Sequence, residues 1–92
     1  MINLEQKTYK EINKELAGRL AMLRKRKGLS QSALASKAGV SFGSLKRFEQ
    51  TGEISLQSFT KLMLALGTED ELEGLLTAVP FSSIEEVING QS

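Results

Sequence analysis

The chain has 92 residues, enough for one domain with its own core. It contains no cysteine and no histidine, so disulfides and the usual zinc and acid–base side chains are excluded, and a reducing compartment is favoured. No apolar run approaches the length of a membrane span, and charges are scattered through residues 1–15. We therefore expect a cytoplasmic protein without membrane contact.

Charge is distributed unevenly although the net charge is only +1. Residues 1–50 carry eleven Lys and Arg against four Asp and Glu, a balance of +7, whereas residues 51–92 carry one Lys against seven acids, a balance of −6. This asymmetry indicates a basic surface for a polyanion and a second surface kept away from it. Charge alone leaves open that these side chains only solvate helices.

The first expected helix starts after Thr8 and is stopped by Gly28. Thr8 and Glu11 have the spacing of a capping box, in which the hydroxyl accepts a hydrogen bond from a backbone N–H in the first turn. Four apolar residues then recur at helical spacing: Ile12, Leu16, Leu20 and Leu23.

Two short helices follow, over residues 31–38 and 42–50. Ser30 and Ser41 are their expected caps, and Gly39 is expected to end the first of them in a left-handed conformation. The expected inner faces are apolar or small throughout: Leu34, Ala35, Ala38, Val40, Leu45 and Phe48. Two helices joined by such a short glycine-containing turn form a helix-turn-helix unit.

A fourth helix is expected after Ser55 and ends at Gly67. Its predicted apolar stripe comprises Leu56, Phe59, Leu62, Met63 and Leu66. Thr68 and Glu71 suggest another capping box, which opens a short helix that Pro80 closes off. Three leucines belong to that helix: Leu72, Leu75 and Leu76.

No alternation typical of strands is sustained, so the predicted fold is all-α, a compact five-helix bundle with a central helix-turn-helix and a short C-terminal extension. We expect an N-terminal arm over residues 1–10 and the helix-turn-helix domain over residues 11–78. Residues 79–92 would form a tail for dimer or partner contact. Within the tail, residues 81–90 are predicted to add one short helix.

The pattern "LSQ..LA..AGVS...L.RFE" covers the helix-turn-helix unit. With its surroundings, from about Leu16 to Leu66, it resembles the phage-repressor-like family (lambda repressor/Cro, XRE-type), which includes HipB-type antitoxins. The stretch "RFEQTGEISLQSFTKLMLALG" is closest in wording to the HipB-type regulators. The resemblance implies a DNA-binding transcription regulator whose third helix enters the major groove.

The resemblance predicts which residues meet DNA: Gln31, Ser41, Phe42, Gly43, Ser44, Lys46 and Arg47. Phe42 would pack on a thymine methyl group, Gly43 would let the backbone come close, and Arg47 would pair with guanine O6 and N7. Lys46 and the helix start at Gln31 would meet phosphates. For Phe42 the alternative is packing against a neighbouring helix or partner chain, and for Lys46 and Arg47 it is a solvated face.

Further contacts are implied around the same unit. Backbone amides of residues 52–56 are expected near the duplex backbone, although the charge of Glu53 opposes this. Arg24 and Glu49 occupy positions that pair across the first and third helices in family members, so we interpret them as a structural salt bridge. The charges of residues 25–27 are interpreted as solvated helix-end charges.

Two functions remain open. The first is a sequence-specific repressor that binds a palindromic operator in double-stranded DNA as a homodimer. Its predicted dimer surface comprises Leu72, Leu75, Leu76, Val79, Phe81, Ile84, Val87 and Ile88, and for the leucines the alternative is core packing within the monomer. The second is an antitoxin that autoregulates its operon and neutralises a kinase-like toxin. Binding of RNA is a weaker third option because aromatic residues are few. We expect neither catalysis nor a cofactor or metal.

Overall fold

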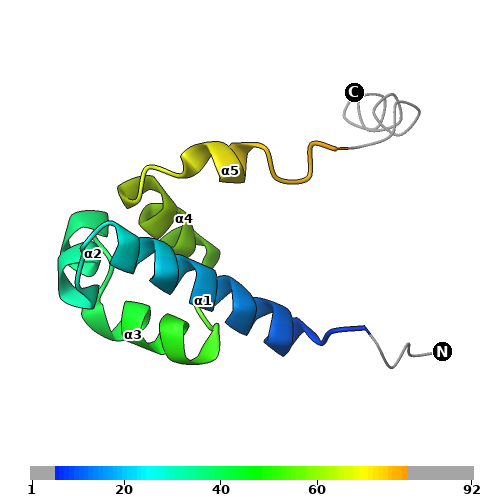
Figure 1. Ribbon diagram of the computed structural model, residues 1–92, viewed down its shortest axis with the longest axis horizontal. Coiled ribbons are helices and arrows are strands. Elements are labelled where there is room, and N and C mark those ends of the chain that lie inside the picture. The colour runs from blue at the N-terminus through cyan, green and yellow to red at the C-terminus, as the bar shows by residue number, and fades with distance from the viewer. Residues whose placement is uncertain (1–5, 79–92) are drawn as a thin grey trace.

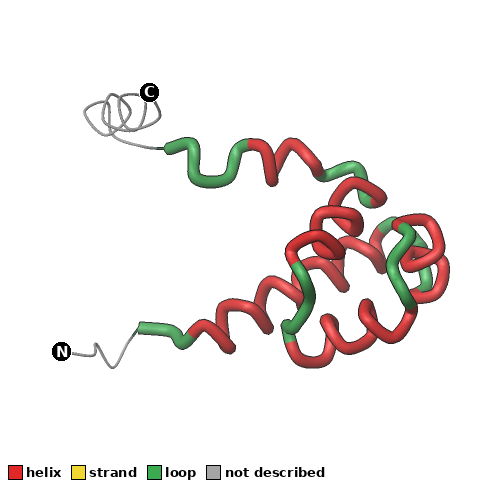
Figure 2. The backbone as a smooth tube through the Cα atoms, turned by 180° about the vertical axis from the view of Figure 1, so that it is seen from behind, coloured by secondary structure: helices red, strands yellow, loops and turns green. Residues whose placement is uncertain are grey.

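The computed structural model describes residues 6–78, which form five α-helices (Figure 1). Their bounds are α1 Tyr9–Arg26, α2 Gln31–Ala38, α3 Phe42–Thr51, α4 Leu56–Ala65 and α5 Glu69–Glu73. Over the described range the backbone contains helices and loops and no strand (Figure 2). The predicted all-α, five-helix fold is confirmed.

Side-chain caps define the starts of the first four helices. The hydroxyl groups of Thr8, Ser30, Ser41 and Ser55 each accept a hydrogen bond from the backbone N–H three residues later, at 3.0–3.2 Å. Such a cap typically contributes about 1 kcal/mol, because it satisfies an N–H that has no partner within the helix. All four starts agree with the predicted caps, since this signal is local in sequence.

The core lies where α1 to α4 meet. It consists of Ala17, Leu20, Leu34, Ala35, Val40, Leu45, Phe48, Phe59, Leu62 and Leu66. Phe48 of α3 and Phe59 of α4 pack edge to face, with ring centroids 5.7 Å apart. In Figure 1, α1 crosses the middle of the bundle with α3 on one side and α4 and α5 on the other. The third helix is thus backed by the core along one side.

Two predicted apolar stripes are not buried at their N-terminal ends. Ile12 is 52% exposed and Leu56 is 77% exposed, although such a stripe normally faces the core. Leu16 is also only partly covered. Ile12 lies in the first turn of α1, which runs beyond the bundle, and Leu56 is the first residue of α4 (Figure 1). Helical spacing gives the direction of a side chain but not how far the neighbouring helices extend.

The fifth helix also differs from its prediction. Thr68 makes no side-chain cap; its hydroxyl instead donates to the carbonyl oxygen of Met63 at 3.0 Å and so satisfies the end of α4. The helix ends at Glu73, which leaves Leu75 and Leu76 outside it and exposed. The residues expected in a tail helix, 81–90, lie outside the described residues, as does Pro80.

Candidate nucleic-acid interface

The turn between α2 and α3 sets the direction of α3. Gly39 has φ of +70°, a left-handed conformation that glycine adopts without strain. Its neighbour Val40 is buried, and the backbone N–H of Val40 donates to the carbonyl oxygen of Ala35 at 3.0 Å. Ala35 itself is buried in the core. The turn is therefore anchored at its centre, and α3 leaves it in one defined direction.

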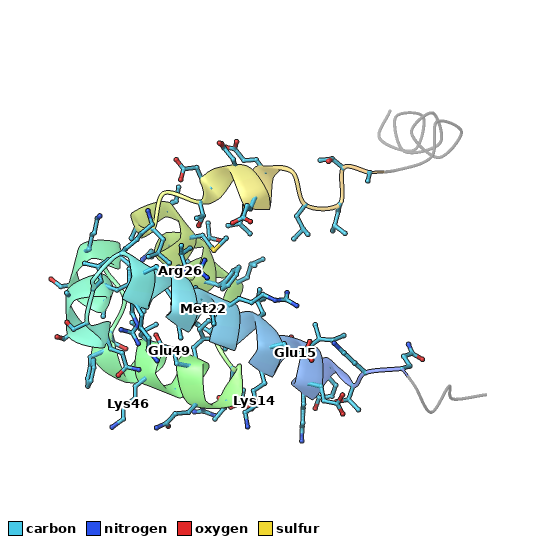
Figure 3. All side chains as sticks on the ribbon, in the orientation of Figure 1. Lys14, Glu15, Met22, Arg26, Lys46 and Glu49 are labelled. Carbon is cyan, nitrogen blue, oxygen red and sulfur yellow. The ribbon has the colours of Figure 1, made fainter. Side chains whose placement is uncertain are left out.

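The outer face of α3 gathers most of the residues predicted to meet DNA. Leu45 and Phe48 are buried, and the remaining predicted residues of this segment are all exposed: Ser41, Phe42, Gly43, Ser44, Lys46 and Arg47. Figure 3 shows Lys46 pointing away from the bundle and Glu49 turned toward it. Phe42 is about half exposed and does not belong to the buried core. This face thus combines two cations, small polar groups and one aromatic ring.

The two serines at the start of α3 have different hydrogen-bonding states. The Ser41 hydroxyl accepts from the backbone N–H of Ser44 at 3.1 Å and donates to the Ser44 hydroxyl at 2.9 Å. Its proton is therefore used within the cap. The Ser44 hydroxyl accepts that bond and retains its own proton for an outside acceptor.

Gln31 is held differently from the residues of α3. Its side-chain amide donates to Glu49 Oε1 at 3.0 Å, and the residue is partly buried. Gln31 therefore lies beside Glu49, near the C-terminal end of α3, and not on the outer face of that helix. One amide hydrogen and the carbonyl oxygen of the side chain are left for an outside partner. Contact of Gln31 with a phosphate stays a prediction.

Arg24 and Glu49 form the predicted salt bridge. Arg24 Nε and Nη2 donate to the two carboxylate oxygens at 2.8 and 2.9 Å, and both side chains are only 8% exposed. Arg24 Nη1 also donates to the carbonyl oxygen of Leu29 at 2.7 Å. Burial raises the pKa of Glu49, but the hydrogen bonds from Arg24 and Gln31 and the nearby positive charges outweigh it, so the pKa is lowered overall. The pair ties α3 to α1 and to the loop before α2.

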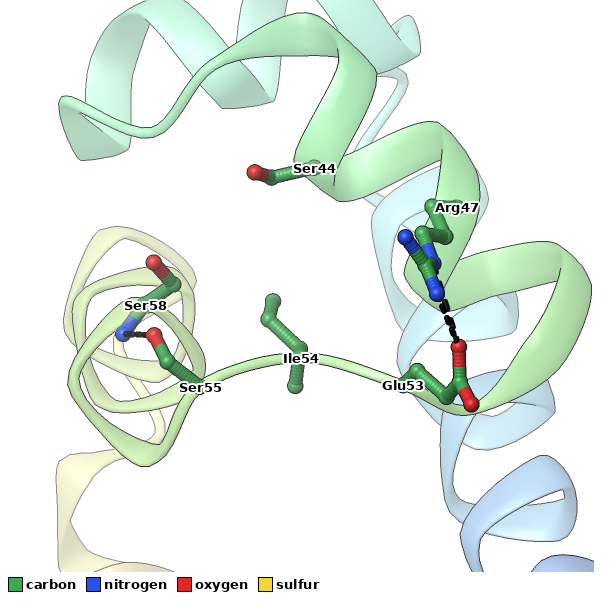
Figure 4. A pocket seen from close by; sticks show the side chains of 6 residues that line it. All are labelled: Ser44, Arg47, Glu53, Ile54, Ser55 and Ser58. Carbon is green, nitrogen blue, oxygen red and sulfur yellow. Dashed lines mark hydrogen bonds and ion pairs between the residues drawn. The ribbon is translucent and has the colours of Figure 1, made fainter.

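A second ion pair, which sequence reasoning missed, holds Arg47. Its Nη2 and Nε donate to Glu53 Oε2 at 2.6 and 3.1 Å, and the two side chains are 69% and 62% exposed (Figure 4). The residues are six apart and separated by the end of α3 at Gly52, so no helical spacing signals the contact. The pair lines an open cavity of about 260 Å³ between α3 and the start of α4.

Gly52 is a second feature that sequence reasoning missed. It has φ of +82°, and a Cβ atom there would lie 2.7–2.9 Å from backbone atoms of Asn13 and Lys14. The end of α3 therefore packs directly on the backbone of α1. The sequence offered only a weak signal, a glycine two residues after the predicted helix end.

Neither a membrane-spanning helix nor a cluster of metal ligands occurs within residues 6–78. None of the helices in that range is both long and apolar enough to cross a membrane. Within the same range, no group of three acidic side chains is placed to hold a metal ion.

Comparison with known proteins identifies the family. No functionally curated protein matches the chain at a significant level. A sequence profile described as a helix-turn-helix domain matches residues 15–76, which is more than half of the chain and includes all five helices in whole or in part. The chain therefore belongs to the helix-turn-helix domain family, which supports a DNA-binding regulator.

Proposed function

We propose that the protein is a transcriptional repressor that binds a palindromic operator as a homodimer. The observation that carries this proposal is the outer face of α3, where six predicted contact residues are exposed together on a helix backed by the core. A helix presented in this way fits the major groove, which admits an α-helix. Residues 11–78 would be the DNA-binding domain.

The exposed groups suggest a division of roles along α3. Phe42 at the helix start would pack on a thymine methyl group, and Arg47 would read guanine from one turn further along. Lys46, a flexible point charge, would hold a phosphate. Gly43 faces open space: apart from its chain neighbours and the backbone of its own helix, no atom lies within 4 Å of the position a Cβ would take, so DNA can approach the backbone here.

Dimerisation follows from the mechanism, because one short helix makes too few base contacts for useful specificity. Two of the leucines predicted for the dimer surface, Leu75 and Leu76, are exposed. Leu75 also lines a largely apolar groove of about 470 Å³ between α1, α4 and α5. In Figure 1 this side of α1 is opposite α3, so a second copy bound here would leave the DNA-binding face open.

An antitoxin of the HipB type is the alternative. The same groove supports this alternative, because an apolar surface away from α3 would let one chain bind a toxin and an operator at the same time. A neighbouring reading frame for a kinase-like protein, and binding of that protein by the purified chain, would favour this alternative over a repressor that acts alone.

Selection of duplexes from a random DNA library tests the main proposal. The purified protein at about 0.15 M salt should recover an inverted repeat with half-sites about 10 base pairs apart. The Arg47→Ala variant should lose preference at one base pair of each half-site, at a cost of roughly 1–3 kcal/mol. Lys46→Ala is the matched control and should weaken binding uniformly across sequences. If nothing is enriched and binding disappears as salt rises, the basic face is only a nonspecific electrostatic surface.

A further inference from the structure

The position of Glu53 relative to Arg47 is fixed by the end of α3. The Thr51 hydroxyl donates to the carbonyl oxygen of Arg47 at 2.8 Å and accepts from the backbone N–H of Glu53 at 3.1 Å. Between them Gly52 is buried against α1. The turn at Gly52, which packs against α1, thus places the Glu53 carboxylate beside the Arg47 guanidinium.

The ion pair leaves a defined part of Arg47 available. Both of its hydrogen bonds go to one oxygen of Glu53, from Nε and from Nη2. A guanidinium has five N–H donors, so both hydrogens on Nη1 and one on Nη2 remain for an outside acceptor. These lie at the outer end of the group, where two parallel donors can meet O6 and N7 of guanine.

We propose that Glu53 is a specificity-determining positioning residue, which holds the Arg47 guanidinium in the orientation that reads guanine. This inference rests on the proposed function. An exposed ion pair contributes little to stability in water, so the fold gives no strong reason for this contact. Fixing a long side chain before binding lowers the ordering cost of the bound state. Exclusion of water by the DNA then strengthens the attraction between the two charges.

The carboxylate also acts against indiscriminate binding. A negative charge next to the DNA-binding face repels phosphates, which weakens binding to every sequence by a similar factor. A correctly placed guanine would offset this repulsion through the oriented Arg47, and other bases would not. Glu53 should therefore increase the ratio of specific to nonspecific affinity rather than the affinity itself.

Binding of the full chain to two duplexes tests the inference, one selected by the wild type and one scrambled. Glu53→Gln should lower the ratio of the two affinities about tenfold, within the range of a bidentate base contact. Glu53→Asp, which keeps the charge but shortens the reach, should lower it as well. Glu73→Gln on α5 removes the same charge from an exposed site away from α3 and should leave the ratio unchanged. Circular dichroism should show unchanged helix content in all three variants.

Arg47→Ala separates positioning from a plain charge effect. If Glu53 acts through Arg47, adding Glu53→Gln to Arg47→Ala should not lower the ratio further. Tighter binding of both duplexes by Glu53→Gln with an unchanged ratio would show that the carboxylate only masks charge, and would overturn the inference. A fall of equal size in the Arg47→Ala background would also overturn it. If the wild type prefers no duplex, the proposed function fails and this inference fails with it; if Arg47→Ala relaxes the preference and Glu53→Gln does not, only this inference fails.

Discussion

At the scale of single residues, two glycines around α3 have opposite surroundings. Gly52 is buried with positive φ and touches the backbone of α1, whereas Gly43 lies in a helix and faces open space. A methyl group at Gly52 would have no flexible side chain to displace, because its nearest neighbours are backbone atoms. The first glycine is thus required by the fold, and the second is available for DNA.

Gly52→Ala should therefore destabilise the protein by roughly 2–5 kcal/mol. About 1–2 kcal/mol of this comes from the left-handed backbone and about 1–3 kcal/mol from the overlap with α1. Gly43→Ala is the matched control and should stabilise the helix by up to about 1 kcal/mol. Denaturant unfolding of the two variants measures the difference. Equal stability would mean that the end of α3 can move away from α1 at little cost.

At the scale of elements, the buried pair of Arg24 and Glu49 joins α1 to α3, and its strength depends on pH. The pKa of Glu49 is lowered from 4.5 in the folded protein, so on acidification the unfolded chain takes up this proton first. The contribution of the pair to stability is complete above the unfolded pKa and is lost as pH falls through the folded pKa.

We expect the free energy of unfolding to fall more steeply in the wild type than in Glu49→Gln as the pH drops through 4.5 and below. Urea unfolding at several pH values gives the two slopes. The slopes are compared because Glu49→Gln also loses charged hydrogen bonds, and that loss lowers the free energy of unfolding by the same amount at every pH. Glu15→Gln, which removes a carboxylate from an exposed ion pair with Lys7, serves as the control for loss of a negative charge. Parallel curves for Glu49→Gln and the wild type would contradict the assignment.

Some features of the helices could be predicted from the sequence, and others could not. Starts of helices such as those after Ser30 and Ser55 could be predicted, because a cap and the N–H it serves are three residues apart. The buried face of α3 could be predicted too, since Leu45 and Phe48 share one side of a short helix. The exposure of Leu56 could not be predicted, because it depends on how far the neighbouring helices extend.

The candidate site, too, could be predicted only in part. The outer face of α3 followed from helical spacing and the family resemblance. The contacts of Gln31 with Glu49 and of Arg47 with Glu53 depend on how loops bring side chains together, and no short-range pattern records this. The structure therefore changes the expected environment of two predicted contact residues while leaving their roles to experiment.

At the scale of the whole molecule, acidic side chains gather on α5, which lies across α1 from α3 (Figure 1). The basic residues Lys46 and Arg47 lie on α3, and α5 carries four acids in five residues. Figure 1 shows α1 between these two helices. An acidic side kept away from α3 would orient the molecule on DNA, because phosphates attract one side and repel the other. Association through the α5 side would preserve this orientation in a dimer.

Removal of the exposed leucines on that side should therefore weaken the proposed dimer without unfolding the monomer. Leu75→Ser combined with Leu76→Asn should raise the dimer dissociation constant at least tenfold, since burial of each leucine contributes roughly 1.5–3 kcal/mol. Asparagine suits position 76 because φ there is +65°. Sedimentation velocity over a concentration series gives the constant, and Leu64→Ser controls for loss of an exposed leucine outside the groove. Affinity for an inverted repeat should fall with dimerisation while affinity for one half-site stays the same. An unchanged dimer would place the interface elsewhere and leave the groove for a different partner.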